Sequence, residues 1–179
     1  MKLDVPYYSQ KIDVKDLGWK NRACGIVCLK MAMDFYKKDT PSLDELIKIG
    51  VETGAYSLSG WIHQGLIDIA EKFGLRMVRE EFRSDDFAEA EKLREKGINK
   101  IVESLQDDNP VLVSAVKKFK EVNKFHMMIL IGFEGDPKNP EGFYYHDPDA
   151  ESVEEGKNLL VPLEVFQKYW RKMTIFIHP

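Results

Sequence analysis

The stretch KNRACGIVCLKMAMDFY, residues 20–36, places a cysteine and a glycine at the start of a segment that is apolar on nearly every side. A thiol at a helix N-terminus or beside an imidazolium has its pKa lowered from about 8.5 to roughly 3.5–7.5, which makes it a nucleophile near neutral pH. Cys24 is therefore a candidate nucleophile, and Gly25, which keeps bulk away from the thiol, is a candidate substrate contact. A packing role for Cys24 remains an alternative, because cysteine is among the most buried residue types.

The second cysteine, Cys28, lies one helical turn further on, where burial raises a thiol pKa and disfavours the thiolate. On one helix the Cβ atoms of Cys24 and Cys28 are about 5–6 Å apart, which exceeds the roughly 3.5–4.5 Å of a disulfide. We expect two reduced thiols. A zinc site made of both cysteines and a histidine is a further alternative, but two cysteines four apart on one helix, without a second pair, are an unusual ligand set. We expect no metal and no cofactor.

A nucleophilic cysteine requires a base, and the chain has four histidines. His126 follows the polar KEVNK and is the first residue of the apolar run HMMILIGF. Its ring is therefore expected at the start of a core strand, at the edge of the sheet, where an active site could lie. It fits a catalytic base or a solvated residue at a strand end. Surface or packing roles are expected for His63, His146 and His178.

The run YYHDPD supplies a carboxylate that could orient the imidazole. Asp147 ends the strand that follows the one opened by His126. If the two strands form a hairpin, the start of one and the end of the other lie side by side, which brings Asp147 near His126. Alternatively, DPD is a turn, or Asp147 and Asp149 are oxygen ligands of a hard cation.

The helical elements precede most of the predicted strands. Helices are expected at residues 24–36, 40–50, 59–74 and 84–106. Thr40 is the expected cap of the second helix and Gly50 its end. The fourth is strongly charged, so we expect a solvated surface element that Gly97 breaks or stops midway.

Strands are expected at residues 75–81, 110–116, 126–133, 142–148 and 173–179, with a short helix at 162–170. Their order favours mostly antiparallel neighbours, and an α-rich part followed by a β-rich part indicates an α+β fold. The wholly apolar helix at 24–36 is expected to lie buried against the sheet.

Composition narrows the class of protein. A chain of 179 residues that is 44% hydrophobic can bury one sizeable core, so we expect a single domain over 1–179, helical to about 106 and sheet from about 107.

The net charge of -4 arises from 26 basic and 30 acidic residues that are mixed along the chain, which argues against a nucleic-acid partner. No signal-peptide pattern and no apolar run of about 20 residues is present, so we expect a cytoplasmic chain without a membrane span. The oligomeric state is not indicated.

Taken in order, VPYYSQ, ACGIVCLKMAMDFY, HMMILIGFE and FYYHDPD resemble the bacteriocin-processing, double-glycine-leader cysteine peptidases and their stand-alone relatives. The resemblance implies a papain-like fold with Cys24 as nucleophile, His126 as base and later acid, and Asp147 as the residue that orients the imidazole. Gln10 and the backbone N–H of Cys24 would then hold the oxyanion.

The reaction that this resemblance implies is cleavage of a peptide or isopeptide bond through a thioester acyl-enzyme, with a peptide or protein as substrate. An acyl transferase with the same triad and a catalytically silent peptide-binding module remain alternatives. Tyr56 and Trp61 are candidates for a wall of the substrate pocket. Relatives commonly have proline and small residues after the Cys-Gly pair, whereas this chain has Ile26, Val27 and Cys28. The charged segment 84–106 has no counterpart that we can assign.

Overall fold

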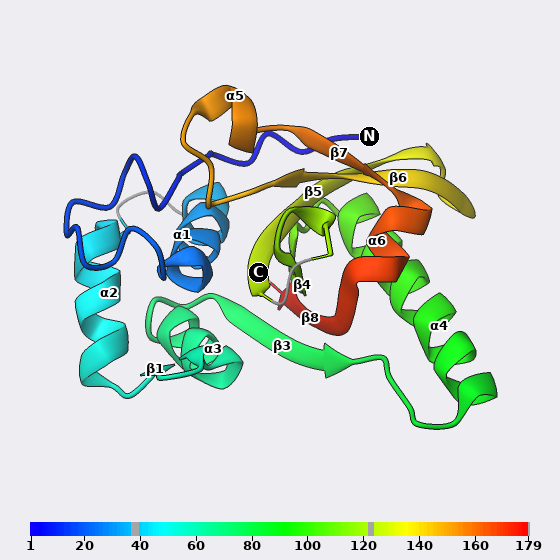
Figure 1. The fold of residues 1–179 in the computed structure, drawn as a ribbon, viewed down its shortest axis with the longest axis horizontal. Helices are drawn as coiled ribbons and strands as arrows, with labels where there is room; N and C mark the ends of the chain where they lie inside the picture. The colour runs from blue at the N-terminus through cyan, green and yellow to red at the C-terminus, as the bar shows by residue number, and fades with distance from the viewer. Residues whose placement is uncertain (37–39, 122–123, 179) are drawn as a thin grey trace.

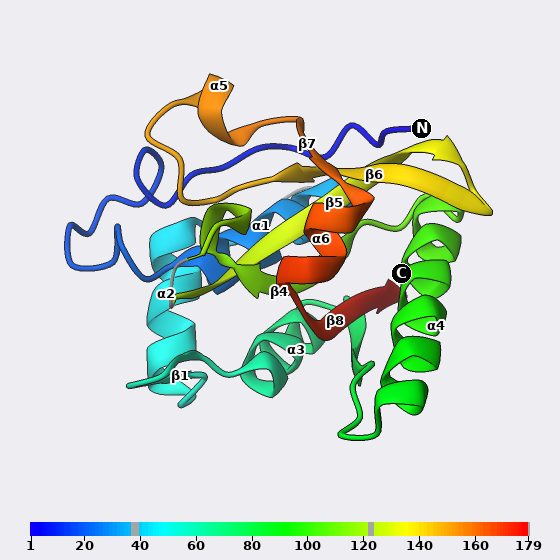
Figure 2. The same cartoon turned by 45° about the vertical axis from the view of Figure 1, so that its right-hand side comes forward.

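The computed structural model describes residues 1–36, 40–121 and 124–178 of the chain. It has an α+β architecture in which helices cover both faces of one antiparallel sheet (Figure 1, Figure 2). Residues 122–123 of the predicted loop before His126, and Pro179, lie outside the described residues. Within those described, no helix has both the length and the apolar character needed to cross a bilayer.

The elements follow one another along the chain as six helices, eight strands and one 3-10 turn within the described residues. They are α1 (Cys24–Tyr36), α2 (Leu43–Glu52), β1 (Tyr56–Ser57), β2 (Gly60–Trp61), α3 (His63–Lys72), β3 (Arg76–Glu81), α4 (Phe87–Gln106), β4 (Val111–Val116), η1 (Lys117–Phe119), β5 (Phe125–Asp136), β6 (Asn139–His146), α5 (Val153–Gly156), β7 (Leu159–Pro162), α6 (Leu163–Tyr169) and β8 (Trp170–His178).

Six strands form the main sheet in the order β3-β8-β4-β5-β6-β7, and every neighbouring pair is antiparallel. The central strands are apolar on both faces because each face carries its own layer of helices. In β5, Met127, Ile129 and Ile131 pack with the first helices, whereas Met128 and Leu130 pack with the second layer. This alternation follows from the two-residue period of a strand.

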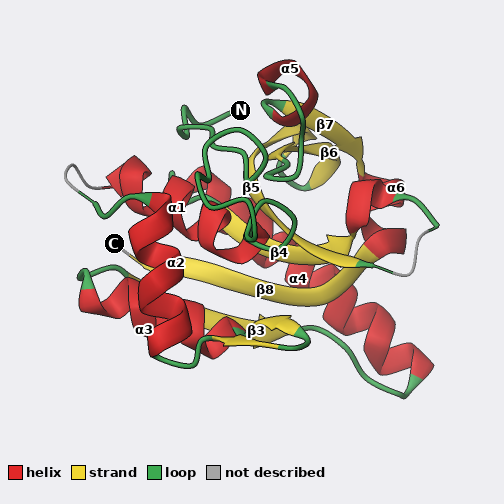
Figure 3. Ribbon diagram, turned by 60° about the vertical axis from the view of Figure 1, so that its left-hand side comes forward, coloured by secondary structure: helices red, strands yellow, loops and turns green. Residues whose placement is uncertain are grey.

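Helix α1 is the centre of the first layer and has the bounds that the sequence predicts. Its residues from Gly25 to Leu29 and from Met31 to Met33 are buried because the helix lies between β5, α2 and α3 (Figure 3). At its start, Cys24 is partly exposed, as are Phe35 and Tyr36 at its end. The fold thus places one reactive side chain at the accessible start of a helix whose middle is buried.

The second layer contains α4, which corrects the prediction for the charged segment. The helix runs without interruption through Gly97, and one face of it is buried against the sheet through Ile98, Ile101, Val102 and Leu105. A Cβ at Gly97 would lie 2.6 Å from Trp170 and 2.7 Å from Phe82. Gly97 therefore allows two aromatic rings to approach the helix instead of ending it.

The predicted cap of α2 is also corrected. Ser42, not Thr40, caps the helix: its hydroxyl accepts from the backbone N–H of Glu45, and the Glu45 carboxylate accepts from the backbone N–H of Ser42. This reciprocal pair satisfies two helix-end donors at once. Gly50 lies inside α2, where a Cβ would meet the Trp61 ring at 2.4 Å, so it is a packing position and not the helix end.

The β5–β6 hairpin is longer than predicted, because both strands continue into the turn-rich stretch and only Pro137 and Lys138 connect them. A bulge beside Gly135, whose φ is +88°, accommodates the irregular register. Strand β7 and the single turn of α5 were not predicted. They follow the loop after Asp147, and β7 forms one edge of the sheet.

Candidate active site

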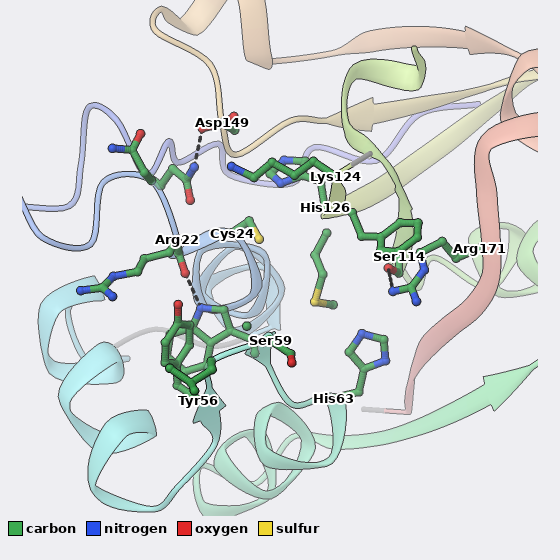
Figure 4. A pocket seen from close by; sticks show the side chains of 17 residues that line it. Arg22, Cys24, Tyr56, Ser59, His63, Ser114, Lys124, His126, Asp149 and Arg171 are labelled. Carbon is green, nitrogen blue, oxygen red and sulfur yellow. Dashed lines mark hydrogen bonds between the residues drawn. The ribbon is translucent and has the colours of Figure 1, made fainter. Parts of the chain in front are cut away.

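Cys24 is the first residue of α1, and its sulfur points into a cleft of about 430 Å³ (Figure 4). The cleft lies between a wall that includes Arg22 and Tyr56 and a wall that includes Ser114 and Arg171. The amides of a first helical turn have no partners inside the helix and point outward. Cys24 is therefore accessible to a ligand and close to donors that favour negative charge.

The hairpin brings His126 and Asp147 together, as its predicted geometry requires. Ile129 of β5 pairs with His146 of β6, so the start of β5 lies beside the residue that follows β6. Nε2 of His126 is 2.7 Å from Oδ1 of Asp147, and the two residues are 5% and 4% exposed. The same Oδ1 accepts from the backbone N–H of Asp149 at 2.9 Å, which fixes the carboxylate.

The other side of the imidazole meets the sulfur. Cys24 and His126 are hydrogen bonded, and since Nε2 faces Asp147, Nδ1 is the nitrogen left for Cys24. Backbone N–H groups of Met127 and Gly25 also donate to the sulfur. Three side chains from α1, β5 and the end of β6 thus form one hydrogen-bonded row.

The charges of this row reinforce one another. Burial raises the pKa of Cys24, but the His126 ring and the backbone N–H groups of Met127 and Gly25 together outweigh it, so the net pKa is below its ordinary value. Burial lowers the pKa of His126, yet Cys24 and Asp147 together raise it to about 10. Burial raises the pKa of Asp147, but the bond to His126, the charge of that ring and the N–H of Asp149 together lower it by more. The favoured state near neutral pH is a thiolate beside an imidazolium and a carboxylate.

Gln10 lies at the edge of the same cleft and is 2% exposed. Its Oε1 accepts from the backbone N–H of Ala23 at 2.9 Å, and its Nε2 donates to the Asp149 carboxylate. These two bonds fix which end of the amide is the nitrogen, and they leave the second N–H of Nε2 for another acceptor.

Asp149, which accepts from this amide, is buried and also forms ion pairs with Lys117 and Lys11. Burial raises its pKa, but Lys117, Gln10 and the charge of His126 together lower it by more, so the carboxylate stays ionised. The sequence offered Asp149 only as a turn residue or a cation ligand. Its contact with Gln10 joins residues 139 positions apart, so no local sequence pattern could predict it.

Aromatic side chains form the wall beside the start of α1. The ring centroid of Tyr56 is 5.1 Å from that of Trp61 and 4.8 Å from that of Trp19. The indole N–H of Trp61 donates to the backbone oxygen of Arg22 at 2.7 Å. A Cβ on Gly25 would lie 2.9 Å from Trp61, so this glycine allows the indole to pack against α1. Tyr56 and Trp61 line the cleft.

The opposite wall contains residues that sequence reasoning did not single out: Ser114, Phe125, Met127 and Arg171. Ser114 is the one polar residue in the run VLVSAV and pairs with Met127, the residue after His126. A serine inside an apolar strand beside the candidate base is the sequence feature from which this wall could have been predicted. No sequence feature identifies Arg171, at the start of β8, as part of it.

The remaining histidines differ from one another. His146 is buried, accepts from the backbone N–H of Asn158 and contacts the backbone oxygen of Val5 at 3.0 Å, which is the predicted packing role. His63 lines the cleft, so its predicted surface or packing role was incomplete. Burial and the nearby Arg79 lower the pKa of His63 and keep the ring neutral.

Cys28 is a free thiol, and burial raises its pKa well above the ordinary value, which separates it from Cys24. In the part of the chain that the structure describes, no group of three or more His, Cys, Asp or Glu side chains could hold a metal ion.

Comparison with known proteins gives a consistent picture. A sequence profile described as the Peptidase C39 like family matches residues 2–175. A search of curated proteins gives no match.

Three solved structures share the fold. A C39-like peptidase from Bacillus anthracis is 18% identical with a TM-score of 0.66, covering 100% of this chain and 98% of its own. A double glycine motif protease from an AMS/PCAT transporter, in complex with the leader peptide, is 20% identical with a TM-score of 0.61, covering 99% and 94%. The peptidase domain of Streptococcus ComA, a bifunctional ABC transporter, is 19% identical with a TM-score of 0.59, covering 89% and 93%. The predicted α+β, papain-like architecture is confirmed.

Proposed function

The chain belongs to the Peptidase C39 like family of cysteine peptidases, and from that membership we propose that it hydrolyses a peptide or isopeptide bond through a thioester acyl-enzyme. Cys24 is the nucleophile, His126 the general acid and base, and Asp147 the residue that orients the imidazole. The observation that carries this proposal is the row Cys24–His126–Asp147, in which a thiol at a helix start meets a buried imidazole bonded to a carboxylate.

In the first half of the reaction the Cys24 thiolate attacks the carbonyl carbon, so that a C–S bond forms and the carbonyl oxygen becomes an oxyanion. The His126 imidazolium then gives its proton to the leaving amine as the C–N bond breaks. In the second half the neutral imidazole takes a proton from water, and the resulting hydroxide attacks the thioester. The C–S bond breaks, and the thiolate and imidazolium are restored.

Gln10 and the backbone N–H of Cys24 are the proposed donors to the oxyanion. The fixed Gln10 amide retains one N–H beyond the bond to Asp149. The Cys24 amide stands at the first position of α1, where no intrahelical acceptor exists. Two donors that are oriented before the reaction stabilise the charge that develops in the transition state.

The substrate class we propose is a peptide or protein. The AMS/PCAT neighbour was solved with a leader peptide bound, which supports a peptide as the ligand of this fold. We further propose that residues 1–179 act as one domain in the cytoplasm, with the cleft between the helical part and the sheet part as the binding site.

Alkylation of Cys24 at pH 6 tests the proposed activation. An ordinary thiol is only about 0.3% ionised at this pH, whereas an ion-paired Cys24 is ionised. The larger thiolate fraction of Cys24 speeds the reaction, but a thiolate with a lowered pKa is a weaker nucleophile. This second effect cancels nearly half of the first on a logarithmic scale, so we expect iodoacetamide to react about 20-fold faster with Cys24 than with glutathione.

Peptide mapping by mass spectrometry identifies the modified residue. Cys28→Ala should retain the fast reaction, and Cys24→Ala and His126→Ala should lose it. A Cys24 that reacts no faster than glutathione would disprove the activated thiolate. Fast alkylation without cleavage of any peptide pool would favour the silent binding module.

A further inference from the structure

The charged side chains that line the active-site cleft are mostly cationic, although the chain as a whole has a net charge of -4. Arg22, Lys124 and Arg171 contribute positive charge, whereas the charge of the His126 imidazolium is balanced by the Cys24 thiolate beside it. The carboxylate among the lining residues, Asp149, is neutralised by Lys117 and Lys11. The cleft is therefore positive on an acidic protein, which favours an anionic ligand.

None of these three cations forms an ion pair with another described residue. Arg22 bonds the backbone oxygen of Gly18 and stacks on Trp19, with 4.6 Å between its Cζ and the ring centroid. Their charges are thus not neutralised by the protein.

Arg171 is held in place by two contacts with the wall of the cleft. Its Cζ lies 3.6 Å above the centroid of the Phe125 ring, and its Nη1 donates to the Ser114 hydroxyl at 3.4 Å. Figure 4 shows Arg171 beside Ser114, on the side of the cleft away from Arg22 and Tyr56. A guanidinium has five N–H donors in one plane, so this anchored group retains donors for a carboxylate.

The surroundings of Arg171 are also short of negative charge. Glu81 is the acidic residue whose charge acts on it, and that carboxylate already binds Arg79 and Arg83. Burial and the neighbouring Arg83 lower the pKa of Arg171, so an arriving anion would relieve repulsion between the cations. The neutral His63 ring completes this part of the wall without adding charge.

We propose that the cleft selects peptides with an aspartate or glutamate close to the scissile bond, and that Arg171 binds its carboxylate. The inference rests on the proposed function, because the cleft must receive a peptide for this selection to operate. Arg22 and Lys124 add a positive field at the rim that draws acidic peptides toward the cleft. Tyr56 and Trp61 then contact the peptide's uncharged part.

The first test compares iodoacetate with iodoacetamide, which differ in charge but alkylate Cys24 by the same reaction. In the wild-type protein the rate ratio of iodoacetate to iodoacetamide should exceed that of glutathione. Arg171→Gln should lower the ratio about 3-fold, which is the effect that Coulomb's law gives for two unit charges separated by about 6 Å of water. Arg94→Gln on α4 is the matched control and should leave the ratio unchanged. Salt at 0.5 M should reduce the wild-type ratio by screening.

The second test uses a positional library of fluorogenic peptides. The wild-type protein should prefer Asp or Glu at one position, Arg171→Gln should lose that preference, and Arg171→Glu should replace it with Lys or Arg. A wild-type preference for neutral residues at every position would overturn the inference, even with Cys24 fully reactive. If no library peptide is cleaved, the alkylation ratio decides: equal ratios in wild type, Arg171→Gln and Arg94→Gln overturn it. Slow reaction with iodoacetamide would instead count against the proposed function.

Discussion

Replacing Asp147 with asparagine separates the charge of this carboxylate from its hydrogen bonds. Both bonds to Asp147, from His126 Nε2 and from the backbone N–H of Asp149, end on Oδ1. An asparagine with its oxygen in the same position accepts both, so the imidazole stays in place. What the variant loses is the negative charge 2.7 Å from the ring.

The size of the effect follows from Coulomb's law. Each charge is spread over its group, so the centres of the ring charge and the carboxylate charge are about 4 Å apart. At an effective dielectric constant of 20 they interact by about 4 kcal/mol, which corresponds to about 3 pKa units. The pKa of His126, about 10 in the wild type, should fall by about that amount and stay above 6. The imidazolium then persists at pH 6. The loss there should be under about 10-fold, whereas activity at pH 9 should fall sharply because His126 is now neutral.

The assay is the pH profile, from pH 5 to 10, of Cys24 alkylation and of kcat/KM on any cleaved peptide. The alkaline limb should move to lower pH in Asp147→Asn, and Asp4→Asn, an exposed control, should leave it in place. A loss of about 10⁴-fold at pH 6 would refute the reasoning. A loss of that size is seen in serine-based triads, where the imidazole is neutral at first and takes up its proton during the reaction. It would therefore mean that His126 is not already an imidazolium before the substrate binds.

Three further predictions concern other parts of the chain. Gln10→Ala should lower kcat by about 10²–10³ while changing alkylation of Cys24 by iodoacetamide little, because alkylation creates no oxyanion; equal losses in both assays would contradict the assigned role. Gly97→Ala should lower the free energy of unfolding by about 1–3 kcal/mol in urea titrations, because the added Cβ would meet Trp170 at 2.6 Å; a gain in stability would show that α4 can move away. Ser42→Ala should cost about 0.5–2 kcal/mol in the same titrations through loss of the helix cap, and an unchanged midpoint would mean that the cap adds nothing.

The parts of the site that could be predicted from sequence are those fixed by local geometry. The contact of His126 with Asp147 follows from a hairpin, because neighbouring antiparallel strands bring the start of one beside the end of the next. The bounds of α1 follow from its uniform apolarity. The assignment of Gln10 came from the family resemblance alone, since the sequence contains no local link between residue 10 and residue 24.

The errors in the fold predictions arise where a glycine has a distant partner. Gly50 and Gly97 were interpreted as helix ends because glycine weakens an isolated helix. In the fold both lie inside helices, where Trp61 and Trp170 occupy the space that a side chain would fill. Strand β7 was missed because a short edge strand is defined by its pairing with β6 more than by its own sequence.

Local patterns in the chain suffice to predict the apolar core, the helix that begins at Cys24 and the strand pair that joins His126 to Asp147. The surroundings of the sulfur arise from contacts between distant segments: Asp149 binds the Gln10 amide, and Arg171 lies on the far wall. Side-chain periodicity acts over only a few residues. Electrostatic fields and steric contacts instead depend on distances between segments that meet only after the chain has folded.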